Sequence, residues 1–164
     1  MQHNFASVIL LLNSLTKPSI QTFNERMKLQ KLVFLARQVG FDAGFSFSWY
    51  IHGPYSPSLT NFLYTVDDVG ILETIPTLPE EEKRKLEASV NRLRSFLGDD
   101  LNKPKALELI ASVWYVLPQG PVSRERKESL TRMLHQIKPD FSLEEYATTA
   151  ERILEFRKSE LSSS

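Results

Sequence analysis

The sequence contains no cysteine, and its three histidines stand far apart. Because no thiol is present, disulfide scaffolds, zinc fingers, iron–sulfur centres and thiol catalysis are excluded. His3, His52 and His135 have no second histidine or carboxylate at the spacing that metal ligands need. We therefore expect neither a metal nor an organic cofactor.

Glycine and long apolar runs are also scarce. The six glycines occur singly, so the chain has neither of the glycine-rich loops that cradle nucleotide phosphates. The longest apolar runs, such as residues 8–12, are far shorter than the roughly 18 residues of a membrane span, and no basic leader precedes that run. We expect a cytoplasmic protein with no membrane segment.

What is present is the composition of an ordinary globular domain. The chain has 164 residues, of which 41% are hydrophobic, and 20 Lys plus Arg balance 20 Asp plus Glu. A chain of this length buries about two-thirds of its unfolded surface. We expect a single domain over residues 1–160 and a frayed tail over residues 161–164.

Most of the chain has the period of amphipathic helices. Caps, prolines and single glycines divide it into expected helices over residues 5–15, 22–39, 57–69, 80–97, 105–117, 124–138 and 143–160. In the second, Lys31 falls off the apolar stripe. The fifth is apolar almost all round and is expected at the centre of the domain. Ser142 and Glu145 form a capping box, with Phe141 and Tyr146 placed as a hydrophobic staple.

The sixth of these helices should turn a smaller apolar set inward. The residues expected to face inward are Leu130, Met133, Leu134 and Ile137.

Two strands are expected beside the helices. Aromatic and aliphatic residues alternate with polar ones over residues 45–51, which predicts a strand with Phe45, Phe47, Trp49 and Ile51 turned inward. Residues 71–75 are placed to form a second strand that pairs with the first. The fold class is therefore mainly α, a compact helical bundle with a minor two-stranded β element.

One polar constellation could be interpreted as catalytic. His52 lies near Tyr50, Tyr55 and Ser56, and a histidine beside a serine is the minimum for nucleophilic catalysis. The favoured interpretation is structural, with His52 and Ser56 holding a strand-to-helix turn and capping its helix. We expect no enzymatic activity.

DNA binding is the alternative function, and it belongs to a different functional class. Residues 45–75 resemble part of a winged helix-turn-helix that lacks a clear wing, with residues 56–69 as the recognition helix. That helix offers no Lys or Arg to phosphates or bases. A basic surplus occurs instead further along, with Arg124, Arg126 and Lys127 as the candidate contacts. The alternative is a winged-helix-like transcriptional regulator, which the zero net charge does not favour.

Five segments, in their order and spacing, carry a resemblance to a known family. They are LQKLVFLARQVG (29–40), YIHGPYSPSL (50–59), VGIL (69–72), LELIASVWYV (107–116) and KPDFSLEEYATTAERIL (138–154). On these segments the sequence resembles the YwgA-like proteins and the related SocA-like Panacea antitoxin domains. The most specific piece is the GPYS turn at residues 53–56.

The resemblance implies a mainly helical domain without known catalysis that binds a partner protein directly. Panacea members act as antitoxins, and SocA-type members as adaptors that hand a toxin to a protease. The expected partner is therefore a toxin or a client destined for proteolysis. The expected contacts are the GPYS turn and the tyrosines around it, since aromatic side chains are frequent interface hot spots: Tyr50, His52, Gly53, Pro54, Tyr55, Ser56 and Tyr64. The alternative is that Tyr55 packs down and the turn is only architecture.

Overall fold

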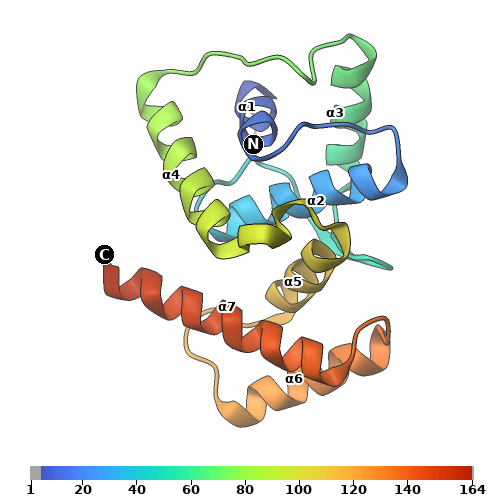
Figure 1. Cartoon of the computed structure of the whole chain (residues 1–164), viewed down its shortest axis with the longest axis vertical. Coiled ribbons are helices and arrows are strands. Elements are labelled where there is room, and N and C mark those ends of the chain that lie inside the picture. The colour runs from blue at the N-terminus through green and yellow to red at the C-terminus, as the bar shows by residue number, and fades with distance from the viewer. Residues whose placement is uncertain (1–4, 164) are drawn as a thin grey trace. The chain divides into compact units, whose positions relative to one another are not determined.

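The computed structural model describes residues 5–163, and this part of the chain is mainly helical (Figure 1). It holds α1 (Phe5–Leu15), α2 (Phe23–Gln38), β1 (Ser48–Tyr50), β2 (Gly53–Tyr55), α3 (Pro57–Asp68), α4 (Glu80–Leu97), a 3₁₀-helix (Gly98–Asn102), α5 (Pro104–Val116), α6 (Arg124–Ile137) and α7 (Leu143–Ser163). The predicted fold class is confirmed. His3 lies outside the described residues.

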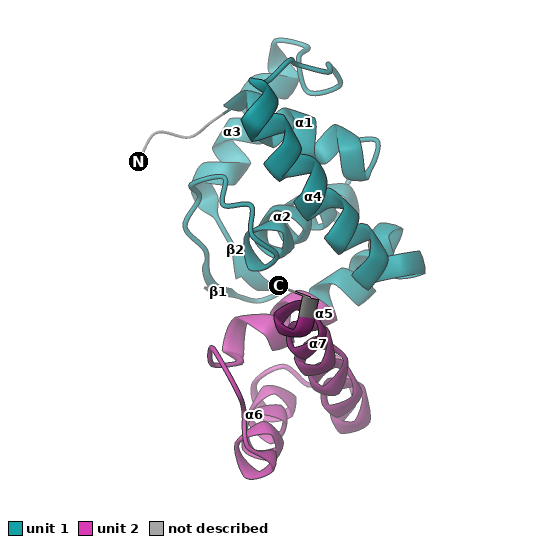
Figure 2. Cartoon of the chain, turned by 90° about the vertical axis from the view of Figure 1, so that its left-hand side faces the viewer, with its two compact units in different colours: residues 1–108 teal, residues 109–164 magenta. Residues whose placement is uncertain are grey.

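The helix boundaries follow the local signals in the sequence. The side chains of Thr22, Ser56 and Ser123 each accept a hydrogen bond from a backbone N–H in the first turn of α2, α3 and α6. The chain divides into two compact units, residues 1–108 and 109–164, with the boundary inside α5 (Figure 2). Our expectation of one domain over residues 1–160 stays a prediction.

In the first unit, α2 is the element around which the others pack. It contacts α1, α3, α4 and β2, and α1 and α4 also contact each other. Every residue from Leu29 to Ala36 is buried, so α2 has almost no solvent-facing side over two turns. The prediction that Lys31 lies off the apolar stripe is wrong. Its side chain is 1% exposed, because it reaches the hairpin and donates to the Pro54 carbonyl oxygen.

The sheet differs from the prediction. Residues 71–75 form no strand; β1 pairs instead with β2, with Ser48 opposite Tyr55 and Tyr50 opposite Gly53. A tight hairpin needs backbone of positive φ, and Gly53 supplies it at +89°. Local pairing also costs less chain entropy than pairing across α3. Ile51 does not face inward, since it lies in the turn and is 83% exposed.

In the second unit, α6 and α7 pack against each other, and α7 begins as predicted. The Ser142 hydroxyl accepts from the Glu145 N–H, and the Glu145 carboxylate accepts from the Ser142 N–H. The rings of Phe141 and Tyr146 meet edge to face, with centroids 5.8 Å apart, which confirms the staple.

One expectation for this unit is wrong. Leu134 is buried on α6 and Leu130 is half-buried, but Met133 and Ile137 are exposed, so only the Leu130 and Leu134 side of the apolar stripe is covered. The expectation of a frayed tail over residues 161–164 stays a prediction, and α7 is described as far as Ser163.

Candidate functional site

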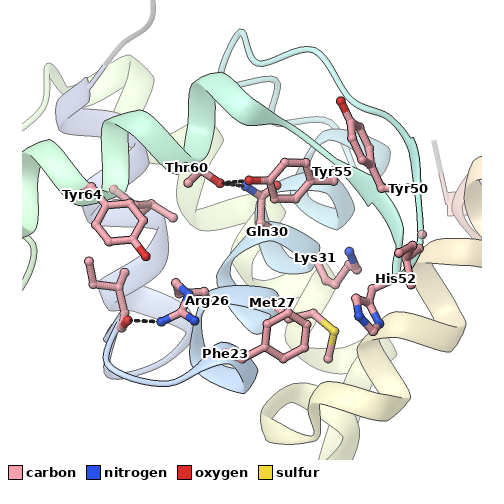
Figure 3. Close-up of a pocket in the computed structure, with 14 residues that line it drawn as sticks. Phe23, Arg26, Met27, Gln30, Lys31, Tyr50, His52, Tyr55, Thr60 and Tyr64 are labelled. Carbon is pink, nitrogen blue, oxygen red and sulfur yellow. Dashed lines mark hydrogen bonds between the residues drawn. The ribbon is translucent and has the colours of Figure 1, made fainter.

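A mainly apolar pocket of about 390 Å³ opens in the first unit, between the first half of α2, the β-hairpin and α3 (Figure 3). Its walls are formed by Ile20, Phe23, Arg26, Met27, Gln30, Lys31, Tyr50, Ile51, His52, Gly53, Tyr55, Thr60, Leu63 and Tyr64. The volume lies within the range of roughly 300–1,000 Å³ that is usual for binding pockets.

Large apolar side chains line this pocket while remaining open to solvent. Phe23 from α2, Tyr64 from α3 and Tyr50 from the hairpin are each about half exposed, at 51%, 49% and 46%, and Ile51 is exposed at the hairpin turn. Figure 3 shows Phe23, Tyr50 and Tyr64 on different sides of the pocket. We call these four residues the rim. Exposed apolar side chains gathered around a hollow are typical of a binding surface.

Gln30 fixes the GPYS turn that forms one wall of the pocket. Its side-chain oxygen accepts from the Ser56 N–H, and its side-chain nitrogen donates to the Ser56 carbonyl oxygen and to Thr60 Oγ1, each at 2.9 Å. Thr60 Oγ1 donates in turn to the Tyr55 hydroxyl at 2.7 Å. The two bonds between Gln30 and Ser56 are buried, so they are shielded from water and attach the turn to α2.

Two cations of α2 also line the pocket. The buried Lys31 ammonium donates to the Pro54 carbonyl oxygen at 2.8 Å. The half-buried Arg26 guanidinium donates to the Ile20 carbonyl oxygen at 2.9 Å. No Asp or Glu is among the lining residues that the structure describes.

His52 closes the hairpin side of the pocket. Its ring packs edge to face on Phe23, with centroids 4.9 Å apart. Its Nδ1 lies 3.5 Å from a carboxylate oxygen of Glu108, which is itself fully buried and pairs with Lys105 at 3.2 Å. The geometry of the His52–Glu108 approach is not that of a hydrogen bond. His52 therefore acts here as an aromatic wall beside a buried carboxylate.

The structure brings together five of the seven contacts expected from the sequence. Tyr50, His52, Gly53, Tyr55 and Tyr64 line the pocket.

The other two expected contacts are buried outside the pocket. The Ser56 hydroxyl accepts from the Leu59 N–H and caps α3, so it serves the turn itself. Pro54 contributes the carbonyl oxygen that Lys31 binds. We leave both residues out of the contact surface.

Sequence reasoning missed the α2 wall of the pocket, including Phe23, Arg26, Gln30 and Lys31. A signal was present, because Gln30 and Lys31 interrupt an apolar run between Leu29 and Leu32. Two long polar side chains amid buried positions need partners, and buried polar groups are nearly always hydrogen-bonded. The identity of those partners depends on the fold.

The basic residues of the DNA-binding alternative lie on α6 in the second unit. Arg124 pairs with Glu128, and Lys127 pairs with Glu151, so acidic neighbours offset two of the three charges. On α3, the described side chains include no Lys or Arg. The hairpin precedes α3, and no strand follows it in the part of the chain that the structure describes.

No family model, curated protein or solved structure matches this chain. The YwgA-like and Panacea resemblance therefore stays a prediction. None of the described helices is both long enough and apolar enough to cross a membrane. Within residues 5–163, no cluster of three histidine or acidic side chains is arranged to hold a metal ion.

Proposed function

We propose that this chain is a non-catalytic, cytoplasmic protein-binding module whose contact surface is the pocket and its rim of Phe23, Tyr50, Ile51 and Tyr64. The observation that carries the proposal is the exposure of these four apolar side chains at an apolar hollow. Burying them against a partner would remove a large apolar area from water, which is the main driving force of protein association. Two of the four are tyrosines, a residue type enriched among interface hot spots.

The hydrogen bonds that attach the GPYS turn to α2 support the same proposal. Gln30 and Lys31 hold the backbone of the GPYS turn from below, so the hairpin side of the pocket is already ordered before any partner arrives. Preorganisation lowers the entropy cost of binding. Within this proposal, an antitoxin or adaptor role is the form that the family resemblance implies, and the partner would be a toxin or a protease client.

The position of the Ser56 hydroxyl, the candidate nucleophile, does not favour a catalytic role. The Ser56 hydroxyl is buried and is engaged in capping α3. It therefore cannot reach a substrate without unwinding the start of the helix. The DNA-binding alternative stays a prediction, and no feature of the described residues favours it over protein binding.

The experiment is an affinity capture from the native host with a matched pair of variants. Ile51→Asp places a charge on the rim, and Ile75→Asp places the same charge on an equally exposed isoleucine outside the pocket, the two being 83% and 78% exposed. We expect wild type and Ile75→Asp to retain the same stoichiometric protein after nuclease treatment, and Ile51→Asp to lose it.

Two outcomes would contradict the proposal. Capture that is equal for all three proteins would place the contact surface elsewhere. Material that disappears on nuclease treatment would favour the nucleic-acid alternative.

A further inference from the structure

Basic side chains occur in the pocket wall. Arg26 and Lys31 line the pocket, and no carboxylate does so among the described lining residues. Glu108 lies behind His52 and pairs with Lys105. Glu25 is hydrogen-bonded with Thr22 at the start of α2 and interacts electrostatically with Arg26, but it does not line the pocket. A ligand in the pocket therefore meets the Arg26 guanidinium and no lining carboxylate among the described residues.

Arg26 is the cation whose hydrogen-bonding capacity is least used. Among the described residues, its guanidinium makes one hydrogen bond, to the Ile20 carbonyl oxygen, and its electrostatic neighbour Glu25 is not within ion-pair distance. A guanidinium carries five N–H donors in a planar fork that matches a carboxylate. Solvent still reaches this half-buried side chain and hydrates the remaining donors. A partner that covers the pocket would remove that water.

This loss of hydration determines the chemistry of the partner. Covering a guanidinium with purely apolar surface leaves a desolvated, uncompensated charge, which strongly opposes binding. A carboxylate placed against the fork replaces the lost water with charge-assisted hydrogen bonds. The apolar walls of Met27 and Leu63 at the same time require an apolar group beside it.

We infer that the pocket takes a segment of a partner protein in which a large apolar side chain fills the hollow and an adjacent Asp or Glu pairs with Arg26. The inference rests on the proposed protein-binding function, which it makes more specific. An acidic–apolar segment satisfies both the apolar walls and the cation that lies among them (Figure 3).

The test is selection from a phage-displayed library of random dodecapeptides on the whole protein, run in parallel on wild type, Ile51→Asp and Arg26→Gln. We expect wild type to enrich peptides with Asp or Glu next to Leu, Ile, Phe, Tyr or Trp. Ile51→Asp should lose these peptides. Arg26→Gln should still select apolar peptides, but without the acidic enrichment.

A synthetic pair of peptides then measures the contact directly. The best wild-type peptide and its Glu→Gln or Asp→Asn match are labelled and titrated by fluorescence anisotropy. Wild type should prefer the acidic peptide by about tenfold, the low end of what a hydrogen-bonded ion pair contributes. Arg26→Gln should bind both peptides equally. Arg37→Gln is the matched control on the same helix outside the pocket, and it should retain the tenfold preference.

The outcomes separate the two proposals. Peptides that depend on Ile51 but show no acidic preference, or a preference unchanged by Arg26→Gln, overturn this inference and leave the protein-binding function standing. A library that yields no peptide dependent on Ile51 overturns both. Circular dichroism on each variant checks that it folds, and Arg26→Lys, which keeps the charge, should retain part of the acidic preference if Arg26→Gln proves unstable.

Discussion

Gln30 hydrogen-bonds both backbone groups of Ser56, accepting from its N–H and donating to its carbonyl oxygen at 2.9 Å each. The side-chain amide thus makes the same pair of hydrogen bonds to the Ser56 backbone that a neighbouring β-strand would make. This contact joins α2, which contains most of the LQKLVFLARQVG segment, to the GPYS turn, 26 residues further along the chain. Two of the segments that carry the family resemblance are therefore joined directly by hydrogen bonds.

The first prediction concerns this contact. Gln30→Leu keeps the side chain's approximate size but removes three hydrogen bonds and leaves the buried Ser56 N–H without a partner. We expect the free energy of unfolding to fall by about 2–4 kcal/mol, since each unsatisfied buried group costs about 1–3 kcal/mol. Urea denaturation measures the change. Gln136→Leu, at an exposed position of α6, is the control and should change little; equal losses would contradict the clamp.

The second prediction separates core from surface on α3. Phe62 is 7% exposed and stacks on Phe5, with ring centroids 4.8 Å apart, whereas Tyr64 is about half exposed. Phe62→Ala should lower the free energy of unfolding by about 3–5 kcal/mol. Tyr64→Ala should lower it by about 1 kcal/mol or less and act on partner binding instead. Similar losses in chemical denaturation would mean that Tyr64 is a packing residue.

The third prediction tests the start of α7. Ser142→Ala removes the hydroxyl that accepts from the Glu145 N–H, and we expect a loss of about 1 kcal/mol in the free energy of unfolding. Thr148→Ala, at an exposed position inside the same helix, is the control and should cause no loss. A Ser142→Ala protein with wild-type stability would show that the capping box contributes nothing.

The fourth prediction addresses nucleic acid. We expect no binding of a fluorescein-labelled duplex in anisotropy titrations, because acidic partners offset Arg124 and Lys127 and α3 carries no cation. Electrostatic DNA binding weakens steeply as salt rises from about 50 to 200 mM. Affinity with that salt dependence, reduced by Arg126→Gln, would revive the DNA-binding alternative.

The helix ends could be predicted because their causes are local. Thr22, Ser56, Ser123 and Ser142 each accept a hydrogen bond from an N–H three residues along the chain, and Pro57 is compatible with the first position of α3. Such signals are complete within a few residues of sequence.

The strand pairing and the pocket could be predicted only in part. The tyrosines around the GPYS turn could be named as candidates, because aromatic residues beside a turn are visible in the sequence and are frequent interface hot spots. The choice of β2 over residues 71–75 as the partner of β1 was missed. This choice depends on how the backbone reverses at Gly53. In the sequence, residues 71–75 are also placed to pair with β1.

By itself the sequence determined the number, the extent and the capping of the helices, since hydrogen-bonding side chains and apolar spacing act within a few turns of chain. Only the tertiary structure decided that Lys31 is buried, that Gln30 holds Ser56, and that residues from α2, the hairpin and α3 enclose one pocket. The physical reason is that a long polar side chain is buried only where a distant backbone group comes within hydrogen-bond reach. That distance is set by the packing of whole elements and not by neighbours in sequence.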